Sequence, residues 1–183
     1  MPRAKFLAFI LLIFLAGWAR PALAVEFRAL VRVETLGMTE TGRLYVKGHR
    51  QRFEKEEHGT VVINLVDLDK GQALVLFPDT KTYRQYPIEA QEMAGLPVPV
   101  DLPPQAEKQG EVDMDGYNCQ KYHYIHAYYG EITSWWSPWL GFPLKVIRKT
   151  LTGETKVTLS YIKEGWLQDD LFVVPQGYRK ISQ

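Results

Sequence analysis

The sequence contains a single cysteine, Cys119, and this scarcity limits what can hold the fold together. An intramolecular disulfide is excluded, so a packed hydrophobic core must supply the stability. No neighbouring residue would lower the pKa of the Cys119 thiol. We therefore interpret Cys119 as a small buried hydrophobe and not as a nucleophile, with an intermolecular disulfide as the remaining alternative.

The sequence also lacks an apolar run long enough to span a membrane. Residues 6–15 are uninterruptedly apolar, whereas a spanning helix needs about 20 such residues. Arg3 and Lys5 precede this run, and residues 22–24 (Ala-Leu-Ala) form the small-x-small pattern of a cleavage site. We expect residues 1–24 to be a signal peptide cleaved after Ala24, leaving one domain at 25–183. Since no cysteine follows that site, an acylation signal is missing, and we expect a soluble periplasmic protein.

The sequence also lacks an excess of charge of either sign. Three of the 22 basic residues (Arg3, Lys5 and Arg20) lie in the expected signal peptide, so the remaining chain has 19 basic and 21 acidic residues. Binding of nucleic acid requires a cationic excess or a clustered basic stripe, and the sequence shows neither. We therefore expect no nucleic-acid partner.

Alternation of apolar and polar residues dominates the rest of the chain. In residues 25–34 the apolar side chains fall on one face and most charged ones on the other, which is typical of a half-buried strand. Glycine-containing turns separate the successive segments. The strands predicted in this way are 25–34, 42–47, 50–56, 60–66, 73–77, 81–86, 110–114, 117–128, 131–137, 144–151 and 156–163, followed by a short extended segment at 172–175.

Two segments interrupt the strand pattern. Residues 88–95 combine helix-forming residues with a terminal glycine, which predicts a short helix. Residues 96–104 contain four prolines, which exclude a helix or a central strand. We expect this apolar, proline-rich stretch to pack as a loop over the sheet or across a cavity mouth, the alternative being a linker. A helical turn is expected near 168–171. The predicted fold is mainly β (α+β): one large curved antiparallel sheet capped by short helices and the loop.

Short motifs spread along the chain resemble the LolA/LolB-like superfamily of bacterial envelope proteins. They are Leu-Tyr-Val-Lys at 44–47, the segment 74–86 with Phe77-Pro78, Gly-Tyr-Asn-Cys-Gln-Lys-Tyr at 116–122, Trp-Trp-Ser-Pro at 135–138, Phe-Pro-Leu-Lys at 142–145, and the segment 172–178. The resemblance is to an uncharacterised branch of the superfamily and not to the lipoprotein carriers themselves. Each motif is short, and their common order carries the resemblance.

The resemblance implies an incomplete antiparallel β-barrel that encloses an apolar cavity for acyl chains. In the carriers an arginine follows the Val-Lys of the second strand and contacts the lid. Here Gly48 stands at that position and Arg50 follows two residues later, so Arg50 is the candidate for such a contact. This departure puts carrier-type gating in doubt, and the missing N-terminal cysteine argues against the role of an outer-membrane acceptor.

Candidate catalytic and metal-binding patterns are weak. His123 and His126 lie three residues apart in a predicted strand, which directs them to opposite faces. The aspartate pairs at 67/69 and 113/115 adjoin glycine turns and lack the distal glutamate of a calcium loop. No nucleophile elbow, phosphate loop or zinc motif is present. We expect no enzyme, no metal and no cofactor.

A dense aromatic cluster is the strongest functional signal. Nine aromatic residues fall between positions 117 and 142, and they either fill a core or line a cavity: Tyr117, Tyr122, Tyr124, Tyr128, Tyr129, Trp135, Trp136, Trp139 and Phe142. Trp139, beside a proline, is a candidate for a cavity rim. The residues predicted to bind an apolar ligand, in the cavity or its lid, are Met93, Leu96, Val98, Leu102, Tyr122, Tyr124, Trp135, Trp136, Trp139 and Phe142.

Two functions of different class follow from these observations. The first is a periplasmic carrier that binds a lipid acyl chain or a lipoprotein, as a monomer with only peripheral or transient membrane contact. The second is an interaction or stress-sensor module that recognises envelope proteins and has no small-molecule ligand. An apolar lining of the curved sheet favours the first, and a filled interior with a large exposed apolar patch favours the second.

Overall fold

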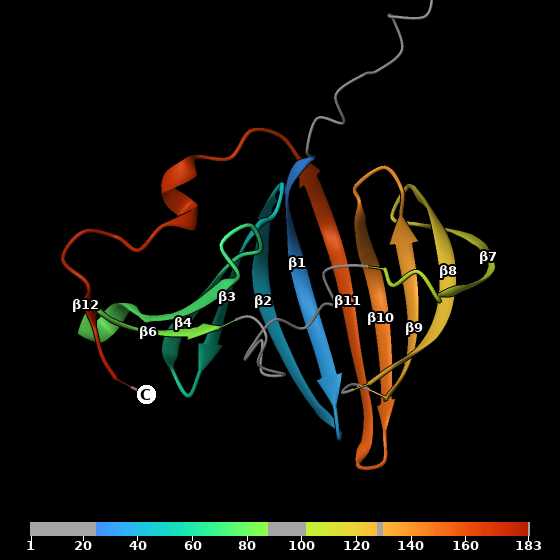
Figure 1. Ribbon diagram of the computed structural model, residues 1–183, viewed down its shortest axis with the longest axis horizontal. Coiled ribbons are helices and arrows are strands. Elements are labelled where there is room, and N and C mark those ends of the chain that lie inside the picture. The colour runs from blue at the N-terminus through green and yellow to red at the C-terminus, as the bar shows by residue number, and fades with distance from the viewer. Residues whose placement is uncertain (1–24, 88–101, 128–129, 183) are drawn as a thin grey trace, which may run out of the picture.

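The computed structural model describes residues 25–87, 102–127 and 130–182, and these form one twelve-stranded sheet (Figure 1). The spatial order of the strands is β12-β6-β5-β4-β3-β2-β1-β11-β10-β9-β8-β7. Their bounds are β1 (Glu26–Thr35), β2 (Met38–Lys47), β3 (Arg50–Glu57), β4 (Thr60–Asp67), β5 (Gln72–Phe77), β6 (Thr82–Pro87), β7 (Glu107–Met114), β8 (Tyr117–His126), β9 (Gly130–Ser137), β10 (Phe142–Thr150), β11 (Gly153–Glu164) and β12 (Arg179–Lys180).

Two meanders meet at the first strand. Strands β1 to β6 follow one another in space, as do β7 to β11, and β1 joins the two sets by pairing with both β2 and β11. All pairs are antiparallel except β12 with β6, which is parallel. Since β12 and β7 lie at the two ends of the strand order, the sheet is open. Figure 1 shows that the sheet is strongly twisted, with β4 and β6 running across the direction of β1.

The prediction of a mainly β, single curved sheet is confirmed, and the prediction of capping helices is not supported. Within the described ranges there is no α-helix, only the 3-10 helices η1 (Pro78–Thr80) and η2 (Asp169–Phe172). The second of these lies where a helical turn was expected. The helix predicted at 88–95 falls outside the described residues. No helix in the described part of the chain is long and apolar enough to cross a membrane.

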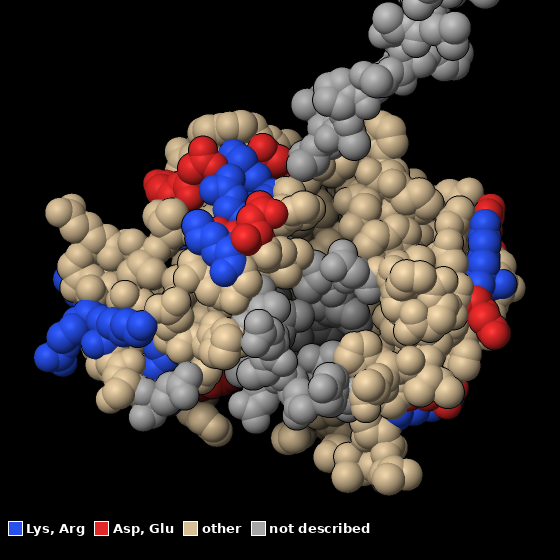
Figure 2. Space-filling model, viewed as in Figure 1, with Lys and Arg blue, Asp and Glu red and all other residues tan. Residues whose placement is uncertain are grey.

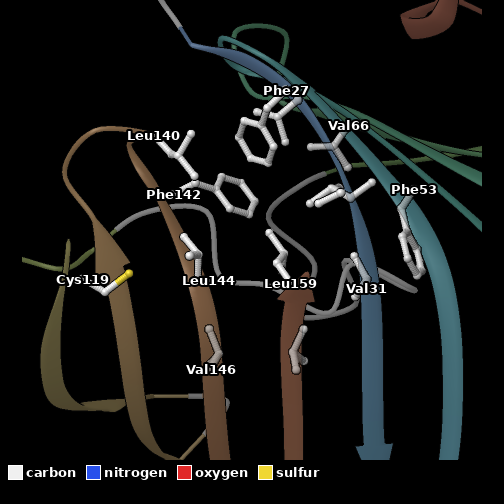
Figure 3. Packing of buried hydrophobic residues seen from close by; sticks show 14 of the residues in the cluster. Phe27, Val31, Phe53, Val66, Cys119, Leu140, Phe142, Leu144, Val146 and Leu159 are labelled. Atoms are coloured by element: carbon white, nitrogen blue, oxygen red, sulfur yellow. The ribbon is translucent and has the colours of Figure 1, made fainter. Parts of the chain in front are cut away.

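The main hydrophobic cluster lies on one face of the sheet, which we call the inner face. It unites buried side chains from β1 to β5 with side chains from β8 to β11 (Figure 3). The rings of Phe27 and Phe142 meet edge to face with centroids 5.5 Å apart, which joins β1 to β10. The cluster as a whole extends from β5 to β8 in the strand order, which requires the sheet to curve around it.

A second, smaller cluster occupies the opposite face, which we call the outer face. Ile63, Leu65 and Leu76 of β4 and β5 are buried there. Val174 and Tyr178, from the segment that follows β11, pack against them. Strand β4 is consequently buried on both of its faces, as its nearly continuous apolar sequence indicates.

Candidate functional site

The inner face is the candidate site, because several of the predicted ligand-binding residues lie in or against its hydrophobic cluster. Tyr124 and Phe142 are buried members of the main cluster, and Leu102 and Trp135 pack against it while partly buried. Tyr122 and Trp136 are half-buried on β8 and β9. Met93, Leu96 and Val98 lie outside the described residues.

Three polar side chains interrupt the apolar inner face on β3, β4 and β6. Gln51 pairs with Val66, and Asn64 pairs with Phe53, so the two amides lie diagonally across β3 and β4 on the face that carries Phe53 and Val66. Arg84 follows in the same row, since Asn64 pairs with Val75 and Val75 with Arg84. The sheet thus sets two amides on adjacent strands and one guanidinium two strands away from Asn64, with Val75 of β5 between them.

Atoms of these three side chains are buried without a hydrogen-bond partner. They are Gln51 Oε1, Asn64 Nδ2 and Arg84 Nε, and only 2% of Gln51 and 4% of Asn64 is exposed. A buried polar atom without a partner costs about 1–3 kcal/mol, so such atoms are rare unless a ligand or water satisfies them. Sequence reasoning missed these residues, although an asparagine inside the apolar run of residues 61–66 is a signal that could have identified one of them.

Trp135 and Trp139 have polar partners that the sequence does not reveal. The ammonium groups of Lys121 and Lys145 lie 5.6 and 4.4 Å from the ring centroid of Trp135, in cation–π geometry. Trp139 is 69% exposed, and its Nε1–H donates to Glu164 Oε2 at 2.9 Å. The indole N–H of Trp139, the residue predicted to lie at a cavity rim, is therefore bound to a carboxylate.

Burial raises three pKa values in this part of the molecule. It raises the pKa of Tyr124 to about 12 and, with a smaller effect from Asp113, that of the Cys119 thiol to about 11. The pKa of Tyr117 rises to about 12 through burial and through its hydrogen bond to Glu164. Thiol and phenols are therefore protonated at neutral pH, and Cys119 is a poor nucleophile.

Arg50 lies on the outer face, where it holds the C-terminal segment. Its Nη2 is 2.7 Å from Asp169 Oδ1, and its guanidinium lies over the ring of Phe172 at 5.2 Å from the centroid. The Asp169 pKa is lowered first by this hydrogen bond and then by Lys47. Arg50 was predicted to contact the lid. Most of that segment, residues 88–101, lies outside the described residues.

Two more basic residues attach the same segment to the sheet. Lys47 Nζ donates to the Leu167 carbonyl at 2.7 Å, and Arg52 Nη1 donates to the Leu171 carbonyl at 2.9 Å. Glu26 Oε2 accepts the Leu167 N–H at 2.6 Å. Figure 2 shows basic and acidic side chains gathered together on this side of the molecule, while much of the other described surface in that view is uncharged. The network explains how a segment with one 3-10 helix is fixed on the outer face.

Metal-ligating residues do not cluster in the described ranges. No group of three or more His, Cys, Asp or Glu side chains could hold an ion there. His123 Nε2 lies 3.3 Å from Glu131 Oε1, and His49 Nδ1 lies 2.7 Å from Asp69 Oδ1. Both pairs are exposed and join side chains of the sheet or its turns.

No protein-family model matches the sequence, and no curated protein matches it. Solved structures do match it. An uncharacterized conserved protein from Thermus thermophilus superposes with a TM-score of 0.61 at 14% identity, over 87% of this chain and 91% of that chain. At this identity the likeness concerns the fold alone.

Two further structural neighbours are more distant. A chain of the Pseudomonas aeruginosa MucA/MucB complex gives a TM-score of 0.43 at 18% identity, over 87% of this chain and 59% of that chain, so this protein spans less than two thirds of that neighbour's length. A LolA superfamily protein from Nitrosomonas europaea gives 0.42 at 10% identity, over 84% of this chain and 91% of that chain. The chain thus shares its fold with the solved protein from Thermus thermophilus.

Proposed function

We propose that the protein is a periplasmic binding or carrier protein that holds an apolar ligand, an acyl chain or the lipid part of a lipoprotein, against the inner face of its sheet. One observation carries this proposal: the buried inner face is apolar across β1 to β5 and β8 to β11 but includes unpartnered polar atoms of Gln51, Asn64 and Arg84. A protein that needed this face only as a core would gain nothing from those atoms.

The pattern matches the chemistry of an amphiphile. Apolar burial supplies about 25 cal/mol for each Å² of ligand surface removed from water. The Gln51 carbonyl offers an acceptor, and the Asn64 amide and Arg84 guanidinium offer donors, which suits an ester, an amide or a carboxylate at the end of an acyl chain. Polar groups that fix the orientation of a ligand in an apolar pocket are typical of small-molecule sites.

Further apolar residues complete the proposed site. Leu102 and Trp135 pack against the main cluster without being fully buried, which suits side chains that a ligand displaces or covers. We propose the same role for Met93, Leu96 and Val98 on the basis of the sequence. The protein acts as a monomer, with no more than transient contact with the membrane.

Native mass spectrometry of residues 25–183, purified from a bacterial periplasm without detergent, tests the proposal. We expect a copurifying mass that organic extraction identifies as a lipid or an acylated peptide. A ligand-free mass that does not change on addition of lipids or lipopeptides would overturn the proposal and favour recognition of envelope proteins.

A matched pair of substitutions tests the location of the ligand. Leu102→Glu places a carboxylate against the main cluster and should abolish retention of the ligand. Leu151→Glu makes the same chemical change at a fully exposed turn residue and should leave retention unchanged. Circular dichroism verifies that both variants fold. Equal retention by the two folded variants would show that the ligand does not contact the inner face near Leu102.

A further inference from the structure

A pocket on the outer face, away from the site proposed above, has the composition of an anion site. Seven residues of the three central strands line it, and its volume is about 370 Å³, which is within the range of small-molecule sites. They are Arg28, Ala29 and Leu30 of β1, Arg43 and Tyr45 of β2, and Tyr161 and Lys163 of β11. The pocket holds three cations and two phenols but no carboxylate.

The strand register forces these like charges together. Arg28 is paired directly with Lys163 across β1 and β11, and Arg43 is paired with Leu30, the next outward residue of β1. Like charges in directly opposed positions of a sheet destabilise it. All three cations are exposed, so solvent reduces this repulsion, and an anion bound between them would remove more of it.

The acidic residues around the pocket have other partners. Glu54 is paired with Arg43 in the register of β2 and β3, but its carboxylate forms its ion pair with Arg52. Glu26 accepts bonds from Lys47 and from the Leu167 amide, and Glu34 pairs with Arg32 and Lys156. Among the described residues, no ion pair includes Arg28, Arg43 or Lys163. A neighbouring groove that shares Leu30, Arg43 and Tyr161 is lined by Glu54 and Glu56 as well, so the purely cationic lining is confined to the first pocket.

A β-bulge aims the third cation into the pocket. Between the pairs Arg28–Lys163 and Leu30–Ser160, strand β11 has an extra residue, and Tyr161 adopts a φ of +53°. Because of the bulge, Ile162 packs against the inner cluster while Lys163 lies opposite Arg28. A bulky residue at positive φ is strained, and Tyr161 keeps that backbone with its ring 73% exposed. Bulges commonly redirect side chains beside functional sites.

The geometry points to this pocket as a binding site for a phosphate group. Two guanidinium groups, one ammonium and two phenol O–H groups offer more donors than the two oxygens of a carboxylate can accept, whereas a phosphate has three or four oxygens and suits guanidinium donors. Leu30, which is partly exposed in the pocket, provides an apolar contact for the rest of the ligand. The phosphate can belong to a soluble compound or to a lipid head group.

Isothermal titration of residues 25–183 with inorganic phosphate and with phenyl phosphate, together with flotation on phosphatidylglycerol vesicles, separates the two sources. Binding of either soluble probe supports the site with a free phosphate compound as ligand. Binding to vesicles alone supports it with a lipid head group. If none of the three probes binds, the assignment is wrong.

Substitutions show whether binding occurs in this pocket. Arg28→Gln combined with Lys163→Gln removes two charge-assisted hydrogen bonds and should weaken binding about tenfold or more. Lys149→Gln combined with Arg179→Gln changes the net charge equally at exposed positions outside the pocket and should have no such effect. Equal weakening by both double variants would show non-specific attraction and overturn the proposal.

Tyr161→Gly supplies an independent measurement. Glycine tolerates the positive φ, so this variant should unfold at a higher temperature than the wild type. It also removes the phenol, so binding of the probe should weaken at the same time. A variant that is more stable and binds the probe as tightly as the wild type would exclude Tyr161 from the site.

Discussion

The two hydrophobic clusters of the sheet differ in what shields them from solvent. The inner cluster gathers side chains from nine strands, and the curvature of the sheet brings them together. The outer cluster has three buried residues on β4 and β5, and the segment after β11 covers it. Hydrogen bonds from Lys47 and Arg52 to two carbonyls fix that cover. The comparison teaches that the sheet builds the inner face by itself, whereas the outer cluster depends on the C-terminal segment.

Removing a large inner side chain should have the largest effect. Phe27→Ala deletes a ring that is fully buried and packed against Phe142, and we expect a loss of about 3–5 kcal/mol in the free energy of unfolding. Urea denaturation measures it. Because the inner cluster spans both meanders, the whole sheet should lose stability together. Two separate transitions, only one of them shifted by the substitution, would indicate that the two meanders are stabilised independently.

The outer cluster should respond locally. Leu76→Ala leaves a cavity below Val174 and Tyr178 and should cost about 2–4 kcal/mol. Hydrogen exchange should accelerate first in residues 165–182, since the covering segment loses its apolar contact. Uniform acceleration across β8 to β11 would instead show that the two clusters form one cooperative unit.

A single added methyl group tests how tightly the inner face is packed. A Cβ on Gly42 would lie 2.5 Å from the Glu54 carbonyl oxygen and 2.5 Å from the ring of Phe53. Gly42→Ala should therefore displace that buried ring and cost about 1–3 kcal/mol. Thermal unfolding measures the loss. Gly37→Ala is the contrasting variant, because its Cβ meets nothing and only its positive φ of +80° opposes the change.

Acid should release the covering segment with the smallest energetic effect. The pKa of Asp169 is lowered by Arg50 and Lys47, so its ionised form stabilises the folded state. That contribution is complete above the unfolded pKa of about 4 and is lost as the pH falls through the lower folded value. The NMR signals of the backbone amides of η2 (Asp169–Phe172) should shift in this acidic range in the wild type. In Asp169→Asn this component of the titration should be absent, and its persistence would assign it to another carboxylate.

Alternation predicted most strands because one face of the sheet is buried. The pattern of residues 25–34 and the apolar run 60–66 correspond closely to β1 and β4. The first half of β2 was missed, since residues 38–41 are exposed and carry no alternation. Strand β12 has two exposed residues, and only its pairing with β6 defines it.

The candidate sites depended more on tertiary structure than on local pattern. Trp139 and Arg50 were selected for a ligand rim and a lid, but their partners Glu164 and Asp169 are distant in sequence. The outer pocket could not be predicted, because it requires the register of β1 against both β2 and β11 and the bulge at Tyr161. Nothing local in residues 156–163 indicates that bulge.

The seam between β1 and β11 has a consequence for the order of folding. Val31 pairs with Leu159, so the first strand of the domain cannot complete its hydrogen bonds until the last long strand has been made. Contacts so distant in sequence slow folding, because the loop must close before they form. During synthesis β1 can pair with β2 early, but its other edge stays unpaired until β11 has been made. That edge is the place at which a newly made chain is most exposed to pairing with another chain.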